Sequence, residues 1–352
     1  MKKKNYSIEM LRFICMLGII MIHVMNQGGI INSDKNMFSN IIISFLFYLV
    51  IPSVNIFAMI TGFLYIEKDG IKYKNLINLL LALIFYSIFI TIIFYGLNLF
   101  GVRNMGMLRL LSSLLPPIVG RYWYITCYIF LFCMIPYINI FIKNINKYKY
   151  KKFLILLFVL LCIIDNFGND LFKIESGYSP FWLVYCYMIG AFIKMYGINV
   201  KHSRIIPYIL IITFINILGN ILSTIIKLPQ ILTLIISYNS PFILIISILI
   251  FVLFLNISFK ESVIIKFLSL TSFGVYLIHG NILIFDFILK NRFQFLLDYN
   301  IVICVVGIIV SSILIYIICS IIEYIRIKVF NLIGISKLSE QIGNKVDRLI
   351  VS

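Results

Sequence analysis

The sequence predicts an all-α protein: a polytopic transmembrane helical bundle of about ten helices with both termini in the cytoplasm. Of its 352 residues, 62% are hydrophobic and only 12% are charged, and the mean hydropathy is +1.07. A soluble domain of this length needs far more polar surface. Apolar runs of about 20 residues recur along the chain, and each is long enough to cross ~30 Å of hydrocarbon as a helix.

Ten apolar segments are expected to form the helices, and the distribution of basic residues tests that number. If the N-terminus is cytoplasmic, most of the 30 Lys and Arg residues fall in segments on the same side, as the positive-inside rule requires. Removing one helix would reverse every later loop. The expected helices span residues 7–26, 40–66, 76–100, 122–142, 152–168, 179–197, 205–226, 241–258, 264–289 and 299–322.

Residues 1–325 are therefore expected to form one transmembrane domain, and residues 326–352 a cytoplasmic, amphipathic tail. The N-terminus carries three lysines before an apolar run, as a signal peptide does. No small-residue cleavage site follows, so the run is interpreted as a retained first helix.

The net charge of +17 does not indicate a nucleic-acid partner, because the basic residues lie in short loops between apolar runs and not in one stripe. The expected surroundings are membrane lipids. Seven cysteines lie within or at the edges of apolar runs, which predicts neither a disulfide framework nor a metal site. No metal and no permanently bound cofactor are expected.

Arg12 and His23 are the most informative residues, because ionisable groups inside a membrane are costly and mark functional sites. They are eleven residues apart, which places them within ~20° of one helix face and about 16 Å apart along the axis. Glu9, three residues before Arg12, is in position to pair with it. Each residue alone has a structural alternative, a snorkelling Arg or a His bonded to a backbone carbonyl. Together they indicate a polar channel.

Four segments in order along the chain resemble the acyltransferase-3 family of integral membrane acyltransferases, of the surface-polysaccharide O-acetyltransferase type. The first is SIEMLR at 7–12 followed by His23, and the second is FAMITGFL at 57–64, with Thr where Ser is more usual. The third is YWYITCY at 122–128 with PYIN at 136–139, and the fourth is SFGVYLIH at 272–279. The ten-helix layout agrees with this resemblance.

The resemblance implies an acyl-CoA donor, usually acetyl-CoA, that approaches from the cytoplasm as a co-substrate. It also implies a hydroxyl acceptor on a cell-surface polysaccharide or its lipid-linked precursor, and it maps the family's essential Arg and His onto Arg12 and His23. Many members carry an Arg-rich motif after the second helix, where this chain has Lys68, Lys72 and Lys74. Lysines bind phosphates as point charges and not as bidentate forks.

These residues suggest a mechanism in which the two substrates meet inside the bundle. The CoA phosphates are expected near Arg12, Lys72 and Lys74, and Thr61-Gly62 is expected to let the backbone approach the donor. His23 is the expected general base on the acceptor hydroxyl, with Arg12 and Glu9 completing the catalytic set.

The remaining assignments stay open between a functional and a structural role. Trp123 and Tyr124 are candidates for acceptor binding or for stabilising the oxyanion, and the alternative is an aromatic belt at the membrane surface. His279 and Asp286, seven residues apart on one expected helix face, form a second polar element of the site or simply pack.

The expected location is the cytoplasmic membrane of a bacterium, since the Ile-, Lys- and Asn-rich usage suggests an AT-rich genome. The main alternative function is a transporter or flippase of a lipid-linked glycan or small polar solute, for which paired halves with matching broken helices are expected but not found. A membrane glycan polymerase or ligase is a further alternative, but the outer loops are small for that class.

Overall fold

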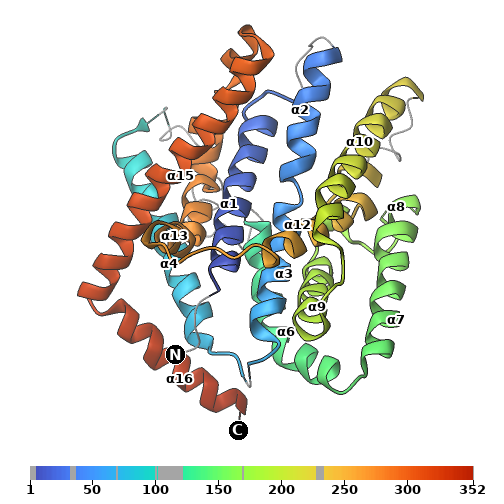
Figure 1. Ribbon diagram of the computed structural model, residues 1–352. Coiled ribbons are helices and arrows are strands. Elements are labelled where there is room, and N and C mark those ends of the chain that lie inside the picture. Colours follow the sequence, from blue (N-terminus) through green and yellow to red (C-terminus); the bar gives the residue numbers. More distant parts are fainter. Residues whose placement is uncertain are drawn as a thin grey trace.

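The computed structural model describes residues 5–31, 37–68, 70–99, 101, 122–168, 170–226 and 234–351. Over these residues the chain is a bundle of α-helices, without β-strands (Figure 1). The all-α prediction is confirmed. The main helices are α1 (Tyr6–Asn26), α2 (Met37–Val50), α3 (Ser53–Tyr65), α4 (Tyr73–Gly96), α6 (Trp123–Lys143), α7 (Lys147–Phe158), α9 (Pro180–Tyr196), α10 (His202–Ile226), α12 (Pro241–Leu255), α13 (Val263–His279), α15 (Ile301–Leu332) and α16 (Ile335–Val351).

Within the described residues, seven helical spans are long and apolar enough to cross a membrane, or eight if one bent pair counts as a single span. This number counts α2 and α3 as one span, Met37–Tyr65, and begins the span of α12 at Leu234. The number ten is therefore not confirmed. Helix α9 has only 17 residues, and α7 begins with a lysine-rich turn and passes into a π-helix at Val159–Ile164. The placement of both termini in the cytoplasm stays a prediction.

Two of the expected helices are broken, and each break has a local cause. The segment 40–66 divides into α2 and α3 at Ile51-Pro52, because proline has no N–H and clashes with the preceding turn. The segment 264–289 bends by 65° after His279. Asn281 begins the next helical segment there by accepting a hydrogen bond from the Leu283 N–H at 3.0 Å, which is an N-cap.

Helix α1 lies in the middle of the bundle, with α13 and α15 on one side and α2 and α3 on the other (Figure 1). Its side chains are largely buried, whereas α15 exposes residues such as Val302 (68%) and Ile318 (57%). Exposed apolar side chains on a membrane-spanning helix face lipid without cost. The central position of α1 brings Arg12 and His23 into the interior of the bundle.

Helices α3 and α9 pack with their backbones in close approach. A Cβ at Gly62 would lie 1.9 Å from the Tyr187 carbonyl oxygen, and one at Gly190 would lie 2.0 Å from the Met59 carbonyl oxygen. Small residues at helix contacts are typical of membrane bundles. The glycine at 62 therefore serves helix packing.

The end of the chain is a separate amphipathic helix, α16, that lies across the beginning of α4 (Figure 1). Lys74 Nζ pairs with Glu340 Oε2 at 2.9 Å, and the Tyr73 N–H donates to Asp347 Oδ1 at 3.1 Å. This ion pair lowers the pKa of the Glu340 carboxyl, through its hydrogen bond to Lys74 and then through the Lys74 charge. Helix α15 continues past residue 325 and ends near Gly334, so the predicted division at 325/326 coincides with no break and stays a prediction.

Candidate active site

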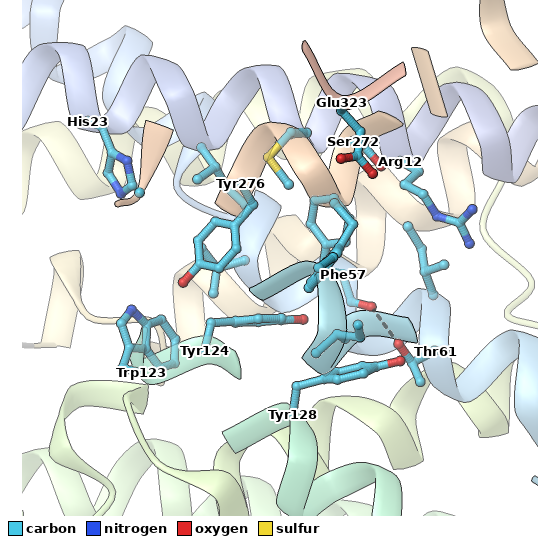
Figure 2. Close-up of a pocket in the computed structure, with 18 of the residues that line it drawn as sticks. Arg12, His23, Phe57, Thr61, Trp123, Tyr124, Tyr128, Ser272, Tyr276 and Glu323 are labelled. Atoms are coloured by element: carbon cyan, nitrogen blue, oxygen red, sulfur yellow. Dashed lines mark hydrogen bonds between the residues drawn. The ribbon is translucent and has the colours of Figure 1, made fainter. Parts of the chain in front are cut away.

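One large cavity, which we call the main cavity, occupies the interior of the bundle between α1, α3, α4, α6, α13 and α15. Its volume is about 1170 Å³, above the ~300–1,000 Å³ that is usual for a single small-molecule site. Arg12 and His23 both line it. Figure 2 shows Arg12 and Thr61 at one end and His23 and Trp123 at the other, with Tyr124 and Tyr276 between them.

The spacing along α1 explains why one helix contributes to both ends. Asn5 caps the helix by accepting a hydrogen bond from the Ser7 N–H at 3.0 Å, and the helix then runs without interruption to Asn26. Arg12, Met16, Ile19 and His23 recur at three- and four-residue steps, which is one face of an α-helix. The structure thus places the two residues singled out from the sequence along one wall.

At the Arg12 end, the guanidinium is held by neighbours from two helices. Arg12 Nη1 lies 3.4 Å from Glu9 Oε2 and 3.4 Å from the Ser269 hydroxyl, and that hydroxyl donates to Glu9. A guanidinium carries five N–H donors in a fixed fork. The contacts made by Nη1 fix the orientation of the guanidinium.

A further cation, Lys68, lies near this end, in the loop after α3. The ammonium of Lys68 lies 3.6 Å from the centroid of the Tyr65 ring, and Tyr65 lines the main cavity. Burial lowers the pKa of Lys68, and the charges of Arg12 and Lys72 lower it further. A cation whose pKa is lowered by other cations lies where an anion is favoured.

Four residues were predicted, in addition to Arg12, to bind the acyl donor, and the structure places them differently. Thr61 and Lys74 line the main cavity, and the Thr61 hydroxyl donates to the Phe57 carbonyl oxygen at 3.1 Å (Figure 2). Lys72 is exposed and caps α4 without lining the cavity. Gly62 is packed against α9, so the structure does not bring it to the cavity.

A second ion pair lines the cavity on α15, and the sequence reasoning missed it. Arg326 Nη2 lies 2.5 Å from Glu323 Oε1 and its Nε donates to Oε2 at 3.0 Å, while the Tyr86 hydroxyl donates to Oε2 at 2.7 Å. The Glu323 carboxyl occupies the space that a Cβ at Gly274 would fill. The expected helix ended at 322, and the available signal was the Glu-x-x-Arg spacing that follows a long apolar run.

At the other end, the His23 ring packs beside a second histidine. The ring centroids of His23 and His279 are 5.1 Å apart, and Phe285 closes another side of His23 at 5.5 Å. His279 Nδ1 lies 2.6 Å from the Val275 carbonyl oxygen; because a carbonyl only accepts, Nδ1 carries the hydrogen of the neutral ring. His23 Nδ1 and His279 Nε2 are buried without a hydrogen-bond partner among the described residues.

His279 itself is 1% exposed and does not line the cavity. It reaches the site through its ring contacts with His23 and Tyr276. Asp286 does line the cavity, but the 65° bend separates its segment from α13. The expected common helix face of His279 and Asp286 is therefore wrong, because the cap at Asn281 interrupts the helix between them.

Aromatic side chains from α6 and α13 form another wall of the main cavity. Trp123, Tyr124, Tyr128 and Tyr276 line the main cavity, and the ring centroids of Tyr124 and Tyr276 are 6.3 Å apart. The Tyr122 hydroxyl donates to the Leu277 carbonyl oxygen at 2.6 Å, which fastens the start of α6 to the end of α13. The structure thus places Trp123 and Tyr124 inside the bundle and beside the cavity.

The site combines three chemical environments along one passage. Cations paired with carboxylates surround one end, tyrosine hydroxyls lie in the middle, and an imidazole with a partnerless nitrogen lies at the other end. Such a set can bind an anion, polarise a carbonyl and accept a proton. Among the described residues, no group of three His, Cys, Asp or Glu could hold a metal ion.

Comparison with known proteins identifies the chemistry. The model of a family described as an acyltransferase domain, Acyl_transf_3, matches residues 5–320, which include α1, all four motif segments and the beginning of α15. Searches of curated proteins and of solved structures returned no match. The chain belongs to the acyltransferase-3 family and is a multi-pass membrane acyltransferase.

Proposed function

We propose that the protein is an O-acyltransferase. It transfers an acetyl group from acetyl-CoA to a hydroxyl of a cell-surface polysaccharide or its lipid-linked precursor. The observation that carries this proposal is the single cavity that joins Arg12 to His23. A donor and an acceptor can enter such a passage from opposite ends and meet inside it. The proposed location is the bacterial cytoplasmic membrane, with the Arg12 end towards the cytoplasm.

The donor is held at the Arg12 end. CoA carries several phosphate charges that cannot cross a bilayer easily, and Arg12, Lys74 and nearby Lys68 supply the complementary charge. Glu9 and Ser269 fix the guanidinium in one orientation, which reduces the entropy lost when it binds a phosphate. The pantetheine arm then lies along α1 towards His23.

Transfer is a single displacement at the thioester carbon. The acceptor hydroxyl gives its proton to His23 as its oxygen forms the new C–O bond, and the resulting oxyanion accepts a hydrogen bond from Tyr124 or Tyr276. The C–S bond then breaks, and the thiolate takes the proton back from His23 and leaves as CoA. His279 holds the His23 ring in place through their contact at 5.1 Å.

Purified protein in liposomes, supplied with radiolabelled acetyl-CoA and de-acylated envelope polysaccharide, tests the proposal directly. Label should enter the polysaccharide as an alkali-labile ester. In cells, deletion of the gene should remove ester-linked acetate from the surface polysaccharide, measured by NMR before and after mild alkali. Loss of the polymer with unchanged acetate per repeat would instead support a transporter or flippase.

A further inference from the structure

A second, smaller cavity adjoins the His23 end of the main cavity. We call it the side cavity; its volume is about 460 Å³, and it is lined by Trp123, Thr126, Cys127, Glu175 and Tyr178. Trp123 and Tyr178 also line the main cavity. These two aromatic rings therefore form the partition between the two spaces.

The partition belongs to a cluster of three aromatic rings in mutual contact. The centroid of Trp123 lies 4.5 Å from that of Tyr178 and 5.7 Å from that of Tyr238, with the Tyr238 ring inclined by only 23°. The Tyr178 and Tyr238 centroids are 5.0 Å apart. Tyr178 remains 44% exposed, so the cluster presents ring surface to both cavities.

The loop that carries Tyr178 is held in an uncommon backbone conformation. Lys173, Glu175 and Ser176 have φ angles of 55°, 52° and 57°, in the left-handed region that residues other than glycine rarely adopt. The Glu175 N–H donates to Asp170 Oδ1 at 2.6 Å, and the Tyr238 N–H donates to the Ser176 carbonyl oxygen at 3.0 Å. Strain that the surroundings maintain in this way marks functional positions.

A buried polar network fixes the other side of the cluster. Asp165 is 1% exposed and accepts hydrogen bonds from the Phe172 N–H at 2.8 Å and from Asn239 Nδ2 at 3.1 Å. Asn239 follows Tyr238 directly, so the network holds the third ring in place. Contacts within the protein thus position the Tyr238 ring without a ligand, and such preorganisation lowers the cost of binding.

The chemistry of the side cavity fits a pyranose. A sugar ring has an apolar face of C–H groups that stacks on aromatic rings and a rim of hydroxyls that need hydrogen-bond partners. Trp123 and Tyr178 supply the ring surface, and Thr126 and Glu175 supply a hydroxyl and a carboxylate. A lipid chain would match this set poorly, because it would leave the carboxylate without a polar partner.

We infer that the side cavity is an acceptor subsite for the sugar unit next to the one that is acylated, so that the acceptor is a glycan chain of at least two units. This inference rests on the proposed function. The unit to be acylated occupies the main cavity beside His23, and its neighbour lies in the side cavity, beside the Trp123–Tyr178 partition that both cavities share. The enzyme would therefore act on an assembled glycan in preference to a free sugar.

The test uses fragments of one to five sugar units, prepared by partial hydrolysis of de-acylated envelope polysaccharide from cells that lack this gene. The full-length protein in liposomes is assayed with radiolabelled acetyl-CoA. For the wild type, we expect KM to fall at least tenfold between one and two units. Thr126→Trp fills the side cavity and should abolish this length dependence, whereas the matched Thr126→Ser variant should keep it. Glu175→Gln should weaken it without adding bulk.

Binding to the partition can also be followed directly. The chain has only two tryptophans, and Trp182 is fully buried with its indole N–H donated to Asn55 at 2.9 Å. A fragment that occupies the side cavity should therefore change the fluorescence of Trp123. In this measurement, Thr126→Leu replaces Thr126→Trp as the cavity-filling variant, because a third tryptophan would add its own signal.

The outcomes separate the two proposals. Equal KM values for one-unit and longer fragments with the wild type, or length dependence that survives in the cavity-filling and Glu175→Gln variants, would overturn the subsite and leave the acyltransfer to glycans intact. Failure of the wild type to label any fragment or the whole polysaccharide would overturn the proposed function itself.

Discussion

The two ends of the main cavity are built from different chemical groups. At the Arg12 end, each cation that lines the cavity is matched by a carboxylate, in the pairs Arg12–Glu9, Arg326–Glu323 and Lys74–Glu340. At the His23 end, aromatic rings and the Asp286 carboxylate line the cavity without a described cation, and His23 Nδ1 is buried without a hydrogen-bond partner among the described residues.

The difference follows from the cost of charge in a low-dielectric interior. Cations that await an anion are tolerated there when nearby carboxylates offset part of their charge and fix their geometry. At the His23 end, no cation among the described lining residues opposes the positive charge that the imidazole gains when it takes a proton. The comparison predicts that changes at the His23 end alter the chemical step and that changes at the Arg12 end alter donor binding or stability.

The largest effect is expected for His23→Ala. Without the base, kcat should fall by about 10²–10⁴-fold, while KM for acetyl-CoA changes little. Steady-state transfer to de-acylated polysaccharide in liposomes measures both constants. His202→Ala is the matched control, because His202 is exposed at the start of α10. Full activity of a folded His23→Ala variant would remove His23 from the chemistry.

Replacement of Glu323 by Gln should mainly affect stability. Arg326 would remain 12% exposed in its side chain without its carboxylate partner, and breaking a buried ion pair in this way costs about 3–5 kcal/mol. Thermal unfolding in detergent should show a clear decrease in Tm. The double variant Glu323→Gln/Arg326→Gln should recover part of the loss, and equal, additive losses would contradict a coupled pair.

Arg12→Gln should raise KM for acetyl-CoA by about 10–100-fold, which corresponds to one charged hydrogen-bonding group worth about 1.5–3 kcal/mol. Arg12→Lys keeps the charge but lacks the forked guanidinium, so its KM for acetyl-CoA should lie between those of Arg12→Gln and the wild type. Isothermal titration with CoA measures the same contribution without catalysis. A large fall in kcat at unchanged KM would place Arg12 in the chemical step and erase the contrast between the two ends.

His279→Phe distinguishes a polar role of the second histidine from simple packing. The phenyl ring retains volume beside His23 but lacks the nitrogens, so we expect kcat to fall about tenfold, a loss of ~1.4 kcal/mol, at unchanged donor KM. For His279→Ala, kcat should fall at least as far. If the Phe variant matches the wild type and only the Ala variant is impaired, the contact with His23 is one of packing alone.

The smallest effect is expected at the Lys74–Glu340 pair, in which Lys74 is half-buried and Glu340 is exposed. Because the pKa of Glu340 is lowered in the folded protein, the pair stabilises α16 against α4 above the ordinary carboxyl pKa and loses that contribution as pH falls through the lowered value. Lys74→Ala should increase proteolysis of α16 and raise donor KM slightly, and Lys72→Ala should do neither. Equal effects of the two substitutions would argue against the cavity as the donor site.

Local signals in the sequence account for much of the bundle and part of the site. Long apolar runs identified most helices, and the eleven-residue spacing of Arg12 and His23 placed both on one face of α1. The breaks at Pro52 and Asn281 also have local causes, but a hydropathy pattern continues through both positions. The Glu323–Arg326 pair had a local signal in its i, i+3 spacing, whereas the hydrogen bond from Tyr86 to Glu323 could not be inferred, because it joins α4 to α15.

The sequence by itself indicated a membrane protein built from helices, and it singled out the two ionisable residues of the first helix. It could do so because hydropathy and helical periodicity are properties of neighbouring residues. Only the tertiary structure decided which helices surround those residues. In the structure, Gly62 packs against α9 and Lys72 lies outside the main cavity. His279, Trp123 and the loop that carries Tyr178 lie at the His23 end. Those placements depend on packing between segments far apart in the chain, which no local pattern encodes.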